Sequence, residues 1–394
     1  MELLPPLIRR SGTRPDSDWP IQIGKNGKHY MRAAPPNSHG FILPLTLWVI
    51  AAIGFATAVL SEWVSEAVTN AIAIQEKANA EIAFANIRNE IIFAVARRPY
   101  TNRGLQVGTF LSPPTGSAFQ DILSANYESD RMIFLDGRPY VLASDTKYAV
   151  QVQDGRGLVN LNTVGREHME RFLSAFQIDE DDRDLLIDTL LDYRDADDLS
   201  RLSGAEKNDY LRRGLHPPAN GQLVSPWEAQ RIIGWTRGTN LWDAQYENPM
   251  ITTCRASGFN PNTAPREVLS AYITGVSMDR ADLLAKHREI APFRNARNIG
   301  DAAGVILLNQ PFFFSFIPGR CLIIDLIDRE TNERIRFSLT LLPLQREQPW
   351  QIDYVLRIPK AYWRSMDQID PSITFPSPEE IAGTTGRFES ATGF

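Results

Sequence analysis

The stretch FILPLTLWVIAAIGFATAVL, residues 41–60, decides the fold of the N-terminal part of the chain. Its twenty residues carry no charge, and a helix of about 20 residues is just long enough to cross a hydrocarbon core of about 30 Å. Pro44 would lie in the first turn of a helix that begins near Phe41, where its missing N–H breaks no intrahelical hydrogen bond. The stretch therefore predicts one membrane-spanning helix.

The same helix is expected to continue beyond the membrane as far as Arg97. Apolar residues recur there at intervals of three and four, which is the period of an amphipathic helix. They are Val64, Val68, Ala71, Ile72, Ala78, Ile82, Ala85 and Ile91. The sequence Arg97-Arg98-Pro99 ends the pattern, so the predicted helix is about 85 Å long at about 1.5 Å per residue. A plain amphipathic stalk would show the same periodicity.

A cleavage site is expected at the front edge of the apolar run. Gly40 directly precedes it and ends the polar segment MRAAPPNSHG. A secretory signal peptide would instead need a small-residue cleavage site after the apolar run, where this chain reads SEWVSEAVTNA. The cut therefore belongs before the apolar run, and the resemblance of this segment to a prepilin leader, which a membrane peptidase removes after glycine, implies a cut between Gly40 and Phe41. The alternative is an uncleaved single-span anchor whose basic leader stays in the cytoplasm. Translation would begin at Met1 or, for a shorter leader, at Met31.

Composition and motifs exclude several classes of protein. The chain has 394 residues, 43% of them hydrophobic, which is enough for an anchor and one or two folded domains. A formal net charge of −6 gives no broad attraction to nucleic acid or anionic lipid. No HExxH, G-x-S-x-G or phosphate-binding glycine loop occurs, so we expect no enzyme. The histidines are scattered, and His168 and His287 are predicted to be surface residues. The five are His29, His39, His168, His216 and His287.

Strand patterns occur in two groups that a long helical region separates. Before the helical region they lie at residues 131–135, 139–144 and 147–153, with Asp136-Gly137 as a turn signal. After it they lie at residues 321–326, 334–342 and 352–358. Between the groups, about 160 residues carry helical patterns such as RDLLIDTLLDY and PREVLSAY. The simplest topology is a helical domain inserted into a split antiparallel sheet, followed by a loose tail from Asp370.

The helical region contains an internal repeat, NLNTVGRE at residues 160–167 and NPNTAPRE at residues 260–267. One interpretation is that both copies start helices, the threonine capping an amide and the glutamate completing a capping box. The other rests on a resemblance to the helix-hairpin-helix modules of DNA-uptake receptors, which bind phosphates through glycine-rich hairpins. The hairpin position ITGVSMD has one glycine. Residues 157–198 carry four basic and twelve acidic residues, so we expect no nucleic acid partner.

The densest charged motif is DTLLDYRDADD, residues 188–198, followed by Gly-Ala-Glu at residues 204–206 and then Asp209-Tyr210. Closely spaced carboxylates on a loop supply the hard oxygen ligands that calcium takes. The spacing is not that of an EF-hand, and a solvated helix face is the alternative interpretation. The candidate ligands are Asp192, Asp195, Asp197, Asp198 and Glu206.

The chain has two cysteines, Cys254 and Cys321, which exclude a disulfide framework and a four-cysteine zinc site. A bridge between them would close a loop of about 67 residues and contribute about 3–4 kcal/mol through the entropy of the unfolded chain. Two separate buried thiols are the alternative.

Taken together, these features resemble the K-type minor pseudopilins of bacterial type II secretion, over most of the mature chain. The resemblance rests on the prepilin-type start, the split sheet, the acidic motif with Gly-Ala-Glu and tyrosine, and the two asparagine motifs. It also rests on Leu45, which stands at mature position five, where most pilin-like subunits carry a glutamate. That glutamate is thought to pair with the terminal amine of a neighbouring subunit, so a subunit without it fits best at the end of a fibre.

The resemblance implies an α+β, pilin-like fold, in which a long membrane-spanning helix packs on an antiparallel sheet with a large inserted all-α domain. That domain would hold two helix-hairpin-helix or SAM-like motifs. The implied segments are a leader (1–40), the N-terminal helix (41–98), the first part of the pilin-like domain (99–154), the insertion (155–318), the second part (319–365) and a flexible tail (366–394).

The resemblance further implies a function without catalysis. A prepilin peptidase would cleave after Gly40 and Phe41 would be N-methylated. The chain would be anchored in the bacterial inner membrane with its bulk in the periplasm, would bind calcium, and would join the I-type and J-type minor pseudopilins at the pseudopilus tip on the inner-membrane secretion platform. A DNA-uptake or type IV pilus-like minor pilin is the alternative function.

Overall fold

The structure is a computed structural model that describes residues 42–107, 132–237, 239–307, 313–345, 347–359 and 373–383. The expected cleavage site, Gly40 and Phe41, lies outside these residues. The chain divides into two units, Met1–Glu76 and Lys77–Phe394, and each is described by itself.

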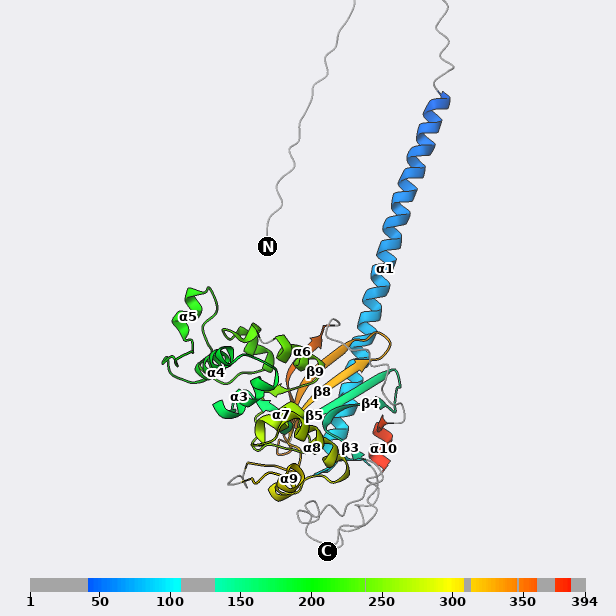
Figure 1. Ribbon diagram of the computed structural model, residues 1–394. Coiled ribbons are helices and arrows are strands. Elements are labelled where there is room, and N and C mark those ends of the chain that lie inside the picture. Colours follow the sequence, from blue (N-terminus) through cyan, green and yellow to red (C-terminus); the bar gives the residue numbers. More distant parts are fainter. Residues whose placement is uncertain are drawn as a thin grey trace, which may run out of the picture. The chain divides into compact units, whose positions relative to one another are not determined.

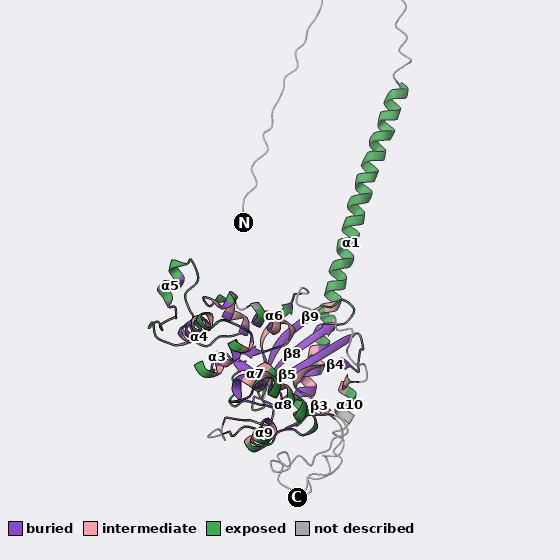
Figure 2. Ribbon diagram, in the orientation of Figure 1, coloured by how far each residue is buried: buried purple, intermediate pink, exposed green. Residues whose placement is uncertain are grey.

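Helix α1 is a single helix, Ile42–Arg97, as the sequence predicts. Every described residue of its first part, up to Glu76, is exposed (Figure 2). Three threonines of this part, Thr46, Thr57 and Thr69, donate their hydroxyls to backbone carbonyls one turn back, so their polar atoms need no water. Within the described ranges, α1 is the one helix long and apolar enough to cross a membrane.

The second unit is built on a six-stranded sheet with the order β10-β9-β8-β5-β4-β11, of which β9, β8, β5 and β4 are labelled in Figure 1. Its strands are β4 (Asp136–Leu142), β5 (Tyr148–Asp154), β8 (Cys321–Asp328), β9 (Arg334–Leu341), β10 (Trp350–Ile358) and β11 (Thr374–Phe375). All neighbouring pairs are antiparallel except β11 with β4, which is parallel. The α+β class and the strand regions expected from the sequence are thereby confirmed.

The C-terminal part of α1 covers one face of this sheet. Ile91 and Val95 of the helix are fully buried and share a core with Val150 of β5 and Ile324 of β8. The strands β5 and β8 are buried along their whole length, which explains why CLIIDLID reads as a nearly continuous apolar run (Figure 2).

The helical region leaves the sheet after Asp154, the last residue of β5, and returns at Cys321, the first residue of the adjacent strand β8. It contains α3 (Arg166–Ala175), α4 (Glu180–Arg194), α5 (Lys207–Arg212), α6 (Thr239–Glu247), α7 (Arg266–Tyr272), α8 (Met278–Ile290) and α9 (Ala296–Ala303). Short 3₁₀ helices occur at Gly155–Gly157, Pro226–Arg231 and Trp235–Arg237. That the region is a domain with boundaries at residues 155 and 318 stays a prediction.

Short strands complete the unit. β1 (Tyr100–Thr101), β2 (Gly104–Gln106) and β3 (Met132–Ile133) form a three-stranded sheet. β6 (Val159–Asn160) and β7 (Ile251–Thr252) pair in parallel within the helical region.

A buried ionic cluster ties α6 to the sheet. Asp325 of β8 accepts hydrogen bonds from Arg334 and Arg336 of β9, and all three side chains are almost fully buried. Arg336 also donates to the backbone carbonyls of Gln245 and Tyr246 in the last turn of α6. Because one carboxylate and two carbonyls share two guanidinium groups, the position of α6 on the sheet is fixed by charge-assisted hydrogen bonds.

Two details differ from the sequence prediction. Asp136-Gly137 is not a turn: it lies inside β4 at a register shift, and Gly137 takes a φ of 82°, which favours glycine. The tail is not loose throughout. β11 and the short helix α10 (Pro378–Gly383) are formed, and Phe375 and Ile381 are fully buried in the core beneath the sheet. The removal of these two apolar side chains from water stabilises this part of the tail against the sheet.

Candidate functional site

The two asparagine motifs adopt the same turn. Asn160 and Asn260 each accept, through the side-chain oxygen, a hydrogen bond from the backbone N–H two residues further on, over 3.0 and 3.1 Å. This is the Asx-turn geometry. The helices begin only at Arg166 and Arg266, and neither has a side-chain hydrogen bond at its N-cap. The capping interpretation is therefore wrong, because the asparagine rather than the threonine organises the turn.

The second asparagine of each motif fastens a distant loop. Asn162 donates to the carbonyl of Leu223 over 3.0 Å and accepts from its N–H over 2.8 Å. Asn262 does the same with Phe293, over 2.9 and 2.8 Å. In both copies the side-chain amide therefore makes the pair of hydrogen bonds that a neighbouring strand would make with the same residue.

An arginine near the end of the second helix of each copy completes the motif. Arg194 of α4 donates to the carbonyls of Leu161 and Val164, over 2.5 and 2.8 Å. Arg288 of α8 donates to the carbonyls of Pro261 and Ala264, over 3.0 and 2.5 Å. The sequence analysis did not select either arginine. Each lies in the second helical pattern after its motif, and this shared position is the signal that could have identified them.

The helices of each copy form a hairpin, α3 with α4 and α7 with α8, and α3 packs against α7. Between the helices, Gln177 has a φ of 58° and Gly275 a φ of 81°, so the turns match although only one carries a glycine. Asp179 and Ser277 are the next N-caps. Phosphate-binding hairpins need glycines whose amides face outward, and Gln177 places a side chain on this turn. The first hairpin therefore has a side chain where the second has a glycine, and the absence of a nucleic acid partner stays a prediction.

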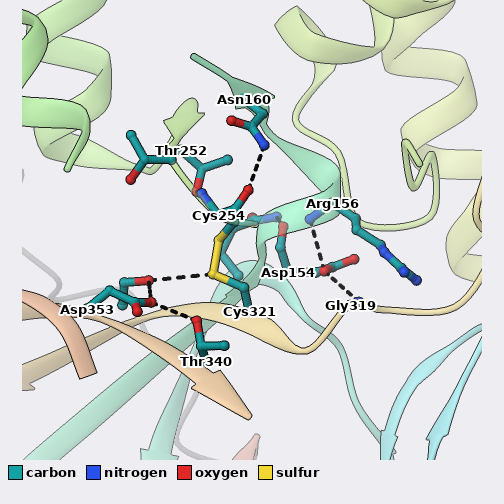
Figure 3. Close-up of a disulfide and its surroundings, with 12 residues drawn as sticks. Asp154, Arg156, Asn160, Thr252, Cys254, Gly319, Cys321, Thr340 and Asp353 are labelled. Atoms are coloured by element: carbon teal, nitrogen blue, oxygen red, sulfur yellow. Dashed lines mark hydrogen bonds between the residues drawn. A yellow bond between two sulfur atoms is a disulfide. The ribbon is translucent and has the colours of Figure 1, made fainter. Parts of the chain in front are cut away.

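Asp154 joins the second motif to the sheet, and Figure 3 shows its hydrogen bonds from Arg156 and Gly319. Its carboxylate accepts four hydrogen bonds: from the N–H groups of Arg156 (3.0 Å) and Gly319 (2.9 Å), from the amide of Asn260 (2.8 Å) and from the hydroxyl of Thr263 (2.9 Å). The side chain is fully buried. Burial raises the pKa of Asp154 above its ordinary value, and the hydrogen bonds oppose that shift.

A disulfide joins Cys254 and Cys321 at the same junction, so these are not two separate thiols (Figure 3). The carbonyl of Cys254 accepts a hydrogen bond of 2.6 Å from the side chain of Asn160, which links the first motif to the bridge. A Cβ atom at Gly155 would lie 2.5 Å from the sulfur of Cys254, so glycine is required beside the disulfide.

The acidic motif lies at the C-terminal end of α4 and in the loop after it. Asp192 is fully buried, and the hydrogen-bond donors that the structure gives it both belong to Arg201: the backbone N–H, at 3.1 Å, and the guanidinium. The same guanidinium nitrogen donates to Asp195 over 2.6 Å. Asp197 accepts from the N–H of Leu199 over 2.9 Å.

Asp198 and Glu206 complete the set of predicted ligands. Asp198 accepts a long hydrogen bond, 3.3 Å, from Asn220. Glu206 is 5% exposed and forms a capping box with Asp209 at the start of α5, although neither carboxylate oxygen reaches hydrogen-bond geometry in the part of the chain that the structure describes. Burial, and then the charges of the other four predicted ligands, raise the pKa of Glu206 to about 7. The structure therefore brings all five residues into one electrostatic cluster.

Asp188 and Gly204, which the sequence analysis quoted in the motif but did not select as ligands, lie beside these residues. Asp188 is buried and accepts hydrogen bonds from Arg166 and from the N–H of Ser203, the latter at 3.0 Å. A Cβ atom at Gly204 would lie 1.8 Å from the carboxylate of Asp192. Gly204 thus lets the backbone pass close to the Asp192 carboxylate, and Glu206 follows two residues later in the same sequence.

The described ranges contain no group of three or more His, Cys, Asp or Glu side chains arranged to hold a metal ion. In the acidic cluster the physical reason is Arg201, whose guanidinium contacts two of the predicted ligands. Carboxylates are the kind of ligand that calcium takes, and the calcium site stays a prediction.

The remaining candidates lie elsewhere. Leu45 is 59% exposed on α1. The surface prediction for His168 is wrong: the ring is partly buried and stacks against Tyr272 at 4.8 Å and Phe313 at 5.4 Å, because α3 packs against α7. His287 is exposed, as expected, and stacks on Phe293 at 5.6 Å.

Two segments of the chain match family models described as type II secretion system (T2SS), protein K: residues 150–240 and residues 259–309. These segments hold the acidic cluster and both asparagine motifs. No curated protein matches the chain. Among solved structures, the chain is similar to a chain of the GspK-GspI-GspJ complex from the type 2 secretion system of enterotoxigenic Escherichia coli, with 14% identity and a TM-score of 0.38 over 53% of this chain and 79% of that one.

Proposed function

We propose that this chain, which belongs to the type II secretion system protein K family over residues 150–240 and 259–309, occupies the tip of the secretion pseudopilus and starts its assembly. As a member of that family it is a minor pseudopilin of type II secretion. It acts as a structural subunit rather than as an enzyme.

Leu45 carries the proposed tip position. In the expected mature chain it is the fifth residue, where most pilin-like subunits carry the glutamate that pairs with a neighbour's terminal amine. Leucine provides no carboxylate, and an unpaired ammonium group in an apolar bundle costs several kcal/mol in free energy. A subunit at the end of the fibre avoids this cost.

The other elements of the function follow from the family. α1 anchors the chain in the inner membrane, and the unit beyond it lies in the periplasm, where the disulfide is favoured by the oxidising environment. Prepilin peptidase removes residues 1–40 and Phe41 is N-methylated. The I-type and J-type minor pseudopilins join the chain in the tip, above the inner-membrane secretion platform.

The acidic cluster binds calcium in this proposal. Asp192, Asp195, Asp197, Asp198 and Glu206 would hold the ion, which supplies the positive charge that the buried carboxylates lack. Bound calcium would stabilise the loop between α4 and α5, since it adds binding free energy to the folded state alone.

Immunogold electron microscopy of pseudopili from cells that make the full-length chain tests the tip position. We expect gold particles at fibre ends only. Leu45→Glu should allow the subunit to enter the shaft and spread the label along it, while Leu47→Glu, at another exposed leucine of α1, should not. Label along the shafts of the unmodified protein would refute the tip position.

A further inference from the structure

A pocket of about 540 Å³ lies where the end of α4 meets the segment after α5 and the segment after the 3₁₀ helix Pro226–Arg231. Tyr193, Ile232 and Ile233 line it, and all three side chains are buried. The volume falls within the range of roughly 300–1,000 Å³ that is typical of ligand pockets. The pocket therefore offers a ligand both room and an apolar wall.

Two arginines of this pocket have no counter-ion. Arg213 directly follows α5 and Arg231 ends the 3₁₀ helix, and both side chains are exposed. Within the described ranges, neither guanidinium lies within 4.0 Å of a carboxylate or makes a hydrogen bond. Each therefore keeps its five N–H donors for water or for a ligand.

The carboxylates closest in sequence to these arginines are engaged elsewhere. Glu228 accepts hydrogen bonds from the hydroxyl of Tyr193, over 3.0 Å, and from the N–H of Val224, over 2.8 Å. Asp209 pairs with the guanidinium of Arg212. None of the described residues that line the pocket is acidic. The pocket is thus a positively charged site on a chain whose formal net charge is −6.

We propose that this pocket binds a short acidic peptide segment of another protein. The carboxylates of the segment pair with Arg213 and Arg231, since a guanidinium fork matches a carboxylate with two parallel hydrogen bonds. An apolar side chain beside them packs against Ile232 and Ile233 and leaves water. Gln230, which also lines the pocket, supplies a donor and an acceptor for the peptide backbone.

The buried apolar wall distinguishes a peptide from a free anion. Inorganic phosphate would use the two guanidinium groups alone and gain nothing from Ile232 and Ile233. The site shares no residue with the proposed calcium ligands or with Leu45, so its failure would leave the proposed function standing.

Equilibrium dialysis of the full-length protein in non-ionic detergent tests the site. The probe is the peptide acetyl-Glu-Leu-Glu-amide with a tritiated acetyl group, and we expect a Kd below about 1 mM. Arg213→Gln and Arg231→Gln should each weaken binding by at least about tenfold, because each removes a charge-assisted pair. Arg212→Gln removes a neighbouring exposed arginine that does not line the pocket, and is the matched control.

Two further probes define the ligand. Acetyl-Gln-Leu-Gln-amide has the same shape without the charges and should bind at least about tenfold more weakly. Inorganic phosphate should not displace the acidic peptide when both are present at equal concentration. Near-UV circular dichroism of each variant should match that of the unmodified protein, since the substituted side chains are exposed.

Three results would overturn the proposal. The first is no binding of the acidic peptide at about 1 mM, which is weaker than a specific site of this kind allows. The second is equal binding of the two peptides, or equal binding by folded Arg231→Gln and Arg212→Gln proteins. The third is displacement of the peptide by an equal concentration of phosphate, which would show a site for free anions.

Discussion

Asp154, the last residue of β5, accepts a hydrogen bond of 2.8 Å from the side chain of Asn260, 106 residues further along the chain. The pair connects the split sheet to the second asparagine motif, and both side chains are fully buried. Cys321, on the strand beside β5, carries the disulfide to Cys254. The exit and the return of the helical region are therefore held by a hydrogen-bonded carboxylate and a covalent bond at one place.

Asn260→Asp should destabilise the protein by about 3 kcal/mol, because it sets a second carboxylate against a buried one and removes a donor. Chemical denaturation of the full-length protein in detergent, followed by near-UV circular dichroism, measures the loss. Asn260→Ala, which removes the donor without adding charge, should cost less. Equal stability of Asn260→Asp and the unmodified protein would contradict the role of this pair.

The two copies of the motif predict matched losses of stability. Asn162→Ala and Asn262→Ala each remove three side-chain hydrogen bonds to the backbone, two of them to one distant residue, so each should lower the free energy of unfolding by about 2 kcal/mol. Guanidinium denaturation measures both. A large loss for one variant and none for the other would show that the copies are not equivalent.

The disulfide closes a loop of 67 residues, so its removal should cost about 4 kcal/mol in the chain-entropy model. The double variant Cys254→Ala/Cys321→Ala should therefore unfold at clearly lower denaturant concentration than the oxidised protein. Each single variant should lose at least as much stability and leave one titratable thiol. Thiol titration of the unfolded native protein should find no free cysteine; two free thiols would count against the bridge.

Gly204→Ala should abolish binding at the acidic cluster, since the added methyl group would lie 1.8 Å from the carboxylate of Asp192. Terbium luminescence measures this, because terbium replaces calcium and Tyr210 lies one helical turn after Glu206, to whose carbonyl its N–H donates over 3.3 Å. Gly221→Ala is the control, as its Cβ atom would meet nothing closer than 3.7 Å. Unchanged luminescence in Gly204→Ala would contradict the proposed ligand set.

His168 predicts a pH dependence of stability. Burial against Tyr272 and Phe313, and then the charge of Arg171, lower its pKa below 6.5, while Glu167 acts in the opposite direction. The unfolded chain therefore binds the proton more readily than the folded chain does. The contribution of His168 to the free energy of unfolding is complete above pH 6.5 and is lost as the pH falls through the pKa of the folded state. Thermal unfolding of His168→Phe should depend less on pH between 7.5 and 5.5 than that of the unmodified protein. His287→Phe, at the exposed histidine of α8, should retain the full dependence.

Residues 41–97 and the strand regions could be read from the sequence because their signals are local. A charge-free run of twenty residues forms a helix in a membrane whatever follows it, and alternating or continuous apolar runs bounded by turn residues form strands. The five predicted calcium ligands are close in sequence and act on one another electrostatically, but the described residues contain no group of three arranged to hold a metal ion, so the ligand set stays a prediction.

The partners of polar side chains depended on the tertiary structure. Asp154 had no signal in the sequence, because its four donors come from residues 156, 260, 263 and 319, which meet only after the sheet and the helical region have packed. The same holds for Arg288 beneath the second motif, and for Phe375 and Ile381, which bury part of an apparently loose tail. The sequence by itself determined which segments become helices and strands, since backbone preference and apolar periodicity act over a few residues. Only the tertiary structure decided which buried polar groups satisfy one another, since a hydrogen bond needs its two atoms within about 3 Å and the chain brings them there from anywhere along its length.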